Sequence, residues 1–180
     1  ISGKDKMDST SAPIDVPDFS KAFDLFEKDS LRGMTAGIPK EYLSVDGMDP
    51  DVEKVFKQAK KILENLGVNI KEISLPHTDY VVAAYYIIAP SEASSNLARF
   101  DGVKYGFREK VSDDLIDMYK KTKSKGFGPE VKRRIMIGTY ALSAGYYDAY
   151  YGRALKVRTL IMEDFSKAFG TCDFILSPVA

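Results

Sequence analysis

The chain contains two short stretches of strand character, Gly33-Met-Thr-Ala-Gly-Ile-Pro39 and Val68-Asn-Ile-Lys-Glu-Ile-Ser-Leu75. We expect Pro39 to end the first strand, because proline has no N–H to donate to a strand ladder. The sequence between the two stretches has helical periodicity, so residues 33–75 form a strand–helix–strand unit. Such a unit is typically a parallel pair of strands joined by a crossover, which indicates an α/β fold.

One amphipathic helix is expected between these strands. Its apolar residues from Val52 to Leu66 recur with a period of about 3.6 residues. Asp49 and Pro50 supply an N-cap and a first-turn proline, and Gly67 is expected to end the helix in the left-handed conformation. Both ends of the helix are therefore predicted by local signals.

The rest of the chain divides into a connecting segment and a mainly helical part. Ser, Asp and Pro punctuate residues 1–32, residues 78–171 contain long periodic apolar stretches, and residues 173–180 resemble a buried strand entering a loop. The expected helices span 78–89, with Pro90 bending or breaking the chain, and then 113–123, 129–145 and 146–169. Because residue 1 is not Met and the last strand looks cut short, we interpret residues 1–180 as a single partial domain of a longer protein.

The composition disfavours several classes of protein. Lys plus Arg and Asp plus Glu both number 26, so the formal net charge of zero gives no signal for nucleic acid or for an anionic membrane. The longest apolar stretch, residues 81–90, is too short to span a bilayer, and Cys172 has no second cysteine to pair with. We therefore expect a cytoplasmic protein with no membrane contact.

No established catalytic or metal-binding motif is found. His77 is the only histidine and follows a proline, so an exposed residue at the start of a helix is favoured over a catalytic base. Ser91, Ser94 and Ser95 lack the flanking glycines of a nucleophile elbow and are interpreted as packing or capping residues. We expect no catalytic residue and no metal site in this sequence, which also lacks zinc-ligand spacing.

Five tyrosines occur within the twelve residues Tyr140-Ala-Leu-Ser-Ala-Gly-Tyr-Tyr-Asp-Ala-Tyr-Tyr151. A tyrosine combines a large apolar ring with one hydroxyl that usually needs a partner when it is buried. The run therefore indicates either a core with polar edges or the wall of a site. We favour packing that holds the preceding helix.

That preceding helix carries the pair Arg133-Arg134. Its apolar stripe consists of Val131, Ile135, Gly138 and Leu142. On a helical wheel Arg134 borders this stripe, whereas Arg133 points away from it into solvent. Arg134 could bind the carboxylate of a substrate, or it could pair with an Asp or Glu of the protein itself.

Tyr85 and Tyr86 lie in the expected helix 78–89, and each could likewise contact a ligand or have a structural role. Tyrosines in an apolar helix are more often core residues with a bonded hydroxyl than contacts to a ligand. Residue patterns alone do not decide between these roles.

Three stretches carry a specific resemblance: Ser91-Glu-Ala-Ser-Ser-Asn-Leu-Ala-Arg-Phe-Asp-Gly-Val-Lys-Tyr-Gly106, Gly126-Phe-Gly-Pro-Glu-Val-Lys-Arg-Arg134 and Gly145-Tyr-Tyr-Asp-Ala-Tyr-Tyr151. They closely resemble the A subunits of glutamyl-tRNA(Gln) amidotransferases, which belong to the amidase signature family. The resemblance covers essentially the whole chain, as a middle-to-C-terminal part of such a subunit. It implies the α/β fold of that family, a mixed β-sheet flanked by helices, which would be incomplete here and mostly helical from residue 78 on.

The resemblance also implies a function. In such A subunits the Ser–cis-Ser–Lys triad of the amidase signature family hydrolyses glutamine. The ammonia then passes to the B subunit, which uses ATP and Mg to convert Glu-tRNA(Gln) to Gln-tRNA(Gln). The triad lies upstream of this sequence, so we expect the chain alone to be inactive and to hold no cofactor. Tyr85 and Arg134 match the positions that bind glutamine, with Arg134 on its α-carboxylate and Tyr86 as the less favoured neighbour. The implied partners are glutamine, the B and C subunits, and tRNA, which is bound mainly through the B subunit.

Two other interpretations stay open. The tyrosines and the basic helix face could form the docking surface of a non-catalytic interaction domain. A related amidase that acts on other amides is the second alternative. Whatever the function, a sheet interrupted at both ends of the sequence would leave an unpaired edge and exposed apolar surface, which favour self-association.

Overall fold

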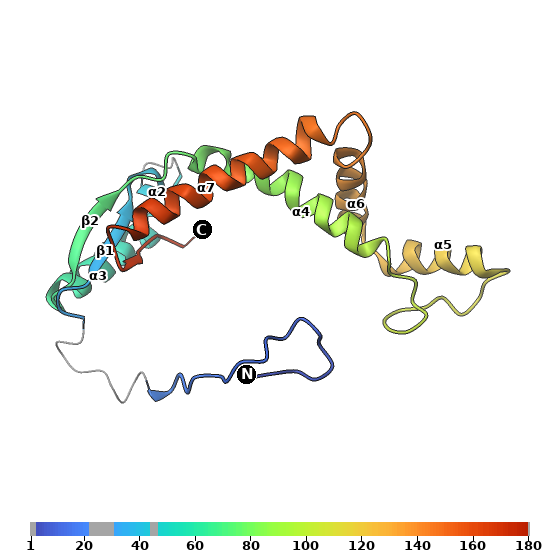
Figure 1. Cartoon of the computed structure of the whole chain (residues 1–180), viewed down its shortest axis with the longest axis horizontal. Coiled ribbons are helices and arrows are strands. Elements are labelled where there is room, and N and C mark those ends of the chain that lie inside the picture. Colours follow the sequence, from blue (N-terminus) through green and yellow to red (C-terminus); the bar gives the residue numbers. More distant parts are fainter. Residues whose placement is uncertain (1–2, 22–30, 44–46, 180) are drawn as a thin grey trace.

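The computed structural model describes residues 3–21, 31–43 and 47–179 (Figure 1). The expected connecting segment 1–32 therefore falls partly outside the described residues, and its described part before residue 22 is almost entirely exposed. The three strands are β1 (Thr35–Pro39), β2 (Asn69–Ile73) and β3 (Phe174–Ile175), which form a parallel sheet in the order β2-β1-β3. The predicted α/β class is confirmed, and the pairing of β1 with β2 is parallel as expected. The division of the chain into the parts named above stays a prediction.

The central strand β1 is held between its neighbours by close packing. Ala36 and Ile38 are buried, and Pro39, opposite Ile73, is the last residue of the strand. A Cβ at Gly37 would lie 2.8 Å from the sulfur of Cys172, so only glycine fits where the chain approaches that buried side chain. Cys172 is thus a packing residue of the sheet.

Helix α3 (Pro50–Asn65) connects β1 and β2, after the short helix α2 (Lys40–Leu43). The side chain of Asp49 accepts a hydrogen bond of 2.7 Å from the backbone N–H of Asp51, and Pro50 occupies the first turn. Gly67 has a φ of +84°, the left-handed conformation predicted for the end of the helix. The predicted N-cap, the first-turn proline and the left-handed glycine at the C-terminal end of the helix are all confirmed.

The helical part consists of a 3₁₀ turn (Thr78–Tyr80), α4 (Val81–Leu97), α5 (Leu115–Gly126), α6 (Pro129–Ala141), a π-helix (Asp148–Gly152) and α7 (Arg153–Phe169). Two expectations need correction. Of the two effects expected of Pro90, a break does not occur, because α4 continues through it to Leu97, and a bend stays a prediction. The helix expected from residue 146 begins as a π-helix, with α7 starting only at Arg153. The hydroxyl of Ser91 donates to the carbonyl of Ile87 at 2.7 Å, which adds a local bond next to the proline.

Helices α4 and α6 lie side by side (Figure 1), and they approach each other most closely at Gly138. A Cβ at Gly138 would lie 2.0 Å from the carbonyl oxygen of Pro90. Beside this contact the hydroxyls of Ser94 and Thr139 lie 2.8 Å apart. A position without a side chain therefore sets how near α6 lies to α4.

Candidate functional site

Arg134 extends from the second turn of α6, whose first turn begins at Pro129. Its Nε donates to Oε1 of Glu130 at 3.2 Å, and Nη1 of Arg133 pairs with the other carboxylate oxygen of Glu130. The side chain of Arg134 is 44% exposed and that of Arg133 is 68% exposed. Arg134 is the more sheltered of the two, as the helical wheel predicted. The internal acidic partner that was the alternative to a substrate is present as Glu130.

The apolar stripe predicted to lie beside Arg134 is covered only in part. Gly138 is buried and Ile135 is half-buried, but Val131 is exposed. The wheel identified the correct face of α6 at the crossing with α4. It overestimated burial in the first turn of the helix.

Tyr85 and Tyr86 lie on α4, the helix against which α6 packs. Their rings contact each other edge to face, with centroids 5.3 Å apart and planes at 73°. Tyr85 is 51% exposed and Tyr86 is 54% exposed, so neither is a core residue of the described chain. Within the described part of the chain neither hydroxyl has a hydrogen-bond partner, so both are accessible to a ligand.

The tyrosine run forms two ring clusters at the far end of α6. Tyr140, Tyr146 and Tyr150 contact one another with centroids 4.5 to 6.0 Å apart, while Tyr147 contacts Tyr151. These rings connect α6 to the π-helix, but most are exposed over nearly half of their surface. The cluster is therefore a partly solvated stack and not a buried core.

Two of these tyrosines have perturbed acidity. The hydrogen bond with Tyr146, together with burial and the nearby Tyr150, raises the pKa of Tyr140 to about 12. The hydroxyl of Tyr151 donates to Oε1 of Glu92 at 2.5 Å, and this bond raises the pKa of Tyr151. Both phenols are thus neutral hydrogen-bond donors near neutral pH, and Tyr151 joins the π-helix to α4.

His77 lies just before the 3₁₀ turn, so its expected position at the start of a helix is confirmed. Its side chain is only partly exposed, however, and not the fully exposed one that was expected. Its backbone N–H donates to Oδ2 of Asp164 at 3.0 Å, and its ring Nδ1 lies 2.9 Å from the same oxygen. Burial alone would raise the pKa of the Asp164 carboxyl, but the hydrogen bonds from His77 outweigh burial and hold that pKa below its usual range. In the described residues no serine, threonine or cysteine hydrogen-bonds the other ring nitrogen, so a nucleophile–His–Asp arrangement is not assembled here.

Sequence reasoning missed two residues of this region, Glu130 and Asp164. The offset of four residues between Glu130 and Arg134 on a helix was a usable signal for their pairing. Asp164 lies 87 residues from His77 in sequence, so no local pattern connects the two.

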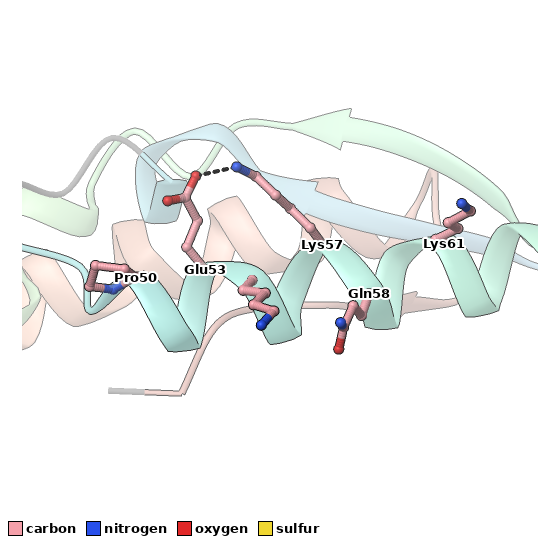
Figure 2. Close-up of a pocket in the computed structure, with 6 residues that line it drawn as sticks. Pro50, Glu53, Lys57, Gln58 and Lys61 are labelled. Carbon is pink, nitrogen blue, oxygen red and sulfur yellow. Dashed lines mark ion pairs between the residues drawn. The ribbon is translucent and has the colours of Figure 1, made fainter.

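The recess shown in Figure 2 lies on the outer face of α3. Its lining includes Pro50, Gln58 and Lys61, and Glu53 pairs with Lys57 across it at 2.5 Å. It is an open surface depression that neither Tyr85 nor Arg134 lines, so it does not enlarge the candidate site.

Metal clusters and membrane-spanning helices are both absent from the described ranges, 3–21, 31–43 and 47–179. No group of three or more His, Cys, Asp or Glu side chains there could hold a metal ion. None of the helices in those ranges is long and apolar enough to cross a membrane.

Residues 1–180 match a protein-family model described as Amidase. The chain is 68% identical over 180 residues to the A subunit of glutamyl-tRNA(Gln) amidotransferase from Desulforapulum autotrophicum, covering 100% of this chain and 37% of that protein. It is 60% identical over 178 residues to the protein of the same name from Heliobacterium modesticaldum, covering 99% of this chain and 36% of that protein. The chain thus spans little more than a third of the length of these curated relatives.

Solved structures agree with these sequence matches. The crystal structure of the glutamyl-tRNA(Gln) amidotransferase A subunit from Thermotoga maritima aligns with a TM-score of 0.57 at 35% identity, over 97% of this chain and 32% of that one. A crystal structure of an amidase aligns with a TM-score of 0.55 at 20% identity, over 83% of this chain and 30% of that one. The second likeness supports the fold alone.

Proposed function

Because the chain belongs to the amidase family, we propose that it is the part of a glutamyl-tRNA(Gln) amidotransferase A subunit that helps to bind glutamine. The resemblance found in the sequence is confirmed at the level of this family. The observation that carries the proposal is the 68% identity to such a subunit over all 180 residues. Eight curated relatives that are 55% to 68% identical to this chain all carry the name of this subunit, which makes action on other amides the weaker candidate.

In this proposal Arg134 binds the α-carboxylate of glutamine and Tyr85 lies beside the same ligand. A guanidinium presents its donors in a fork that matches a carboxylate. The Nε of Arg134 is held by Glu130, which fixes the direction of the side chain while its surface stays partly open. The free hydroxyl of Tyr85, on the adjacent helix, would supply a further polar contact.

The proposed chemistry takes place in the complete complex. A serine nucleophile outside this sequence would attack the side-chain amide of glutamine, release ammonia and leave an acyl-enzyme for water to hydrolyse. The B subunit would use ATP and Mg to activate glutamate on tRNA in the cytoplasm, with the C subunit completing the assembly. The chain itself would supply part of the wall that orients glutamine and no cofactor.

The proposal is tested in a complete A subunit that carries this sequence, assembled with its partners. Arg134→Ala should raise the KM for glutamine about tenfold or more, since a charge-assisted hydrogen bond contributes about 1.5 to 3 kcal/mol. Arg133→Ala is the matched control and should leave KM nearly unchanged, because Arg133 is the more exposed neighbour. An unchanged KM in Arg134→Ala would assign Arg134 a purely structural role.

Two further measurements complete the test. Tyr85→Phe and Tyr86→Phe separate the two candidate tyrosines, and only the first should weaken glutamine binding. The isolated chain should release ammonia from glutamine no faster than buffer does. Activity above that blank would contradict the proposed absence of the nucleophile.

A further inference from the structure

A cavity of about 540 Å³ lies where α4, α5 and α6 meet. Small-molecule sites in proteins typically measure roughly 300 to 1,000 Å³. Most of its wall is apolar, from Leu97, Phe127, Ile135 and Met136. Neither Arg134 nor Tyr85 lines it, so it is separate from the proposed glutamine site.

Two ammonium groups from different helices lie at this cavity. Nζ of Lys123 on α5 donates to the carbonyl of Ala98 at 2.8 Å, and Nζ of Lys132 on α6 donates to the carbonyl of Ser124 at 2.5 Å. A lysine ammonium has three donors, so each group keeps two N–H bonds for a ligand. Among the residues that the structure describes, no Asp or Glu lines the cavity to neutralise them.

Two of the hydroxyls in the wall are satisfied internally. The hydroxyl of Thr139 donates to the carbonyl of Ile135 at 2.7 Å, so the hydroxyl of Ser94 is the donor in the 2.8 Å contact between Ser94 and Thr139. The charged donors of the cavity are therefore the two lysines, beside the neutral hydroxyl of Ser124. A neutral polar ligand would gain only ordinary hydrogen bonds from these ammonium groups, whereas an anion would gain charge-assisted ones.

We propose that this cavity binds a small amphipathic organic acid, with its carboxylate at Lys123 and Lys132 and its apolar body against Ile135, Met136 and Phe127. The flexible thioether of Met136 lies exposed at the rim and can adapt to the shape of the bound body. The inference rests on the cavity alone and is independent of the proposed binding of glutamine.

The test compares 5-phenylvalerate with its neutral amide, 5-phenylvaleramide, on a complete A subunit that carries this sequence and is labelled with ¹³C at its Met and Ile methyl groups. The acid should cause saturable shifts at the methyl groups of Met136 and Ile135. Its affinity should exceed that of the amide by about tenfold or more, the effect of one hydrogen bond to a charged group. Raising the salt concentration from about 50 mM to about 500 mM should weaken binding of the acid and leave binding of the amide unchanged.

Substitutions of the two lysines test whether their charges bind the carboxylate of the ligand. Lys123→Met and Lys132→Met should each reduce the affinity for the acid towards that of the amide, while Lys104→Met, in an exposed loop outside the cavity, should have no effect. The methyl spectrum reports whether each variant is folded, and the comparison of acid with amide needs no variant. Equal affinities for acid and amide would overturn the proposal, as would shifts that centre on Met162 or Met7.

Discussion

The carboxylate of Asp164 is 4% exposed and accepts hydrogen bonds from the backbone and the ring of His77. These bonds join the segment after β2 to the middle of α7. Since they stabilise the charged form, the folded protein gains stability wherever Asp164 is ionised in both states. That gain is complete above the unfolded value of 3.8 and disappears as the pH falls through the lower folded pKa.

We predict that Asp164→Asn lowers the free energy of unfolding by about 1 to 3 kcal/mol at neutral pH, the effect of weakening a buried charged acceptor. The difference in the free energy of unfolding between the variant and the wild-type chain should shrink as the pH falls from about 5 to about 2. Urea unfolding followed by circular dichroism at each pH measures it. Glu163→Gln, at the exposed neighbouring position, is the control and should cost less than about 0.5 kcal/mol. A loss that does not vary with pH would contradict the assigned role of the charge.

Tyr140 gives a second prediction at the level of one residue. Its pKa is raised to about 12, with the hydrogen bond to Tyr146 as the main cause. Tyr140→Phe should therefore remove a titration step near 12 from the ultraviolet absorbance of the phenolates, and Tyr146→Phe should move that step towards 10. Tyr105→Phe, outside the cluster, should leave it in place. A step near 12 that survives in Tyr140→Phe would assign it to another tyrosine.

Among the elements, the crossing of α4 and α6 depends on a position without a side chain. Gly138→Ala should destabilise the chain by about 3 kcal/mol, because the added methyl would meet the backbone oxygen of Pro90 at 2.0 Å. Gly152→Ala is the control, since its Cβ would meet nothing closer than 3.6 Å and alanine favours a helix. Thermal unfolding of both variants measures the effect. Equal stabilities would mean that the two helices can move apart without cost.

Local signals predicted the elements of the sheet unit well and those of the helical part less well. Asp49, Pro50 and Gly67 act within one turn of their own position, so the ends of α3 could be read directly from sequence. Whether Pro90 would bend or break α4 could not be decided from sequence, because a proline removes one helical hydrogen bond and contacts with other elements, such as α6, influence the outcome. Arg134 was recognisable as a candidate from helical spacing and resemblance, but Asp164 and the lysine cavity depend on contacts that join distant segments.

At the scale of the whole molecule, large apolar side chains lie exposed on several elements of the described chain. Val82 and Tyr86 on α4 and Met136 on α6 are all exposed, and in the described sheet β2 and β3 each pair on one side only. Exposed apolar patches and open strand edges both favour association. The chain also spans little more than a third of its curated relatives, so the assembly state of the isolated 180 residues is a property of this segment alone.

We therefore predict that the isolated chain self-associates, with a weight-average sedimentation coefficient that rises with concentration. Placing a charge on the apolar helix faces should oppose association, because a lysine would have to lose its hydration on contact. Val82→Lys and Met136→Lys should shift the protein towards monomer, whereas Met7→Lys, in the exposed N-terminal segment, should not. Sedimentation velocity over a tenfold range of concentration, of the order of 10 to 100 μM, measures the effect. If all three variants self-associate like the wild-type chain, the strand edges and not the helix faces drive association. If the wild-type chain is monomeric at every concentration, the prediction is wrong and its exposed apolar surface is too dispersed to bind a second copy.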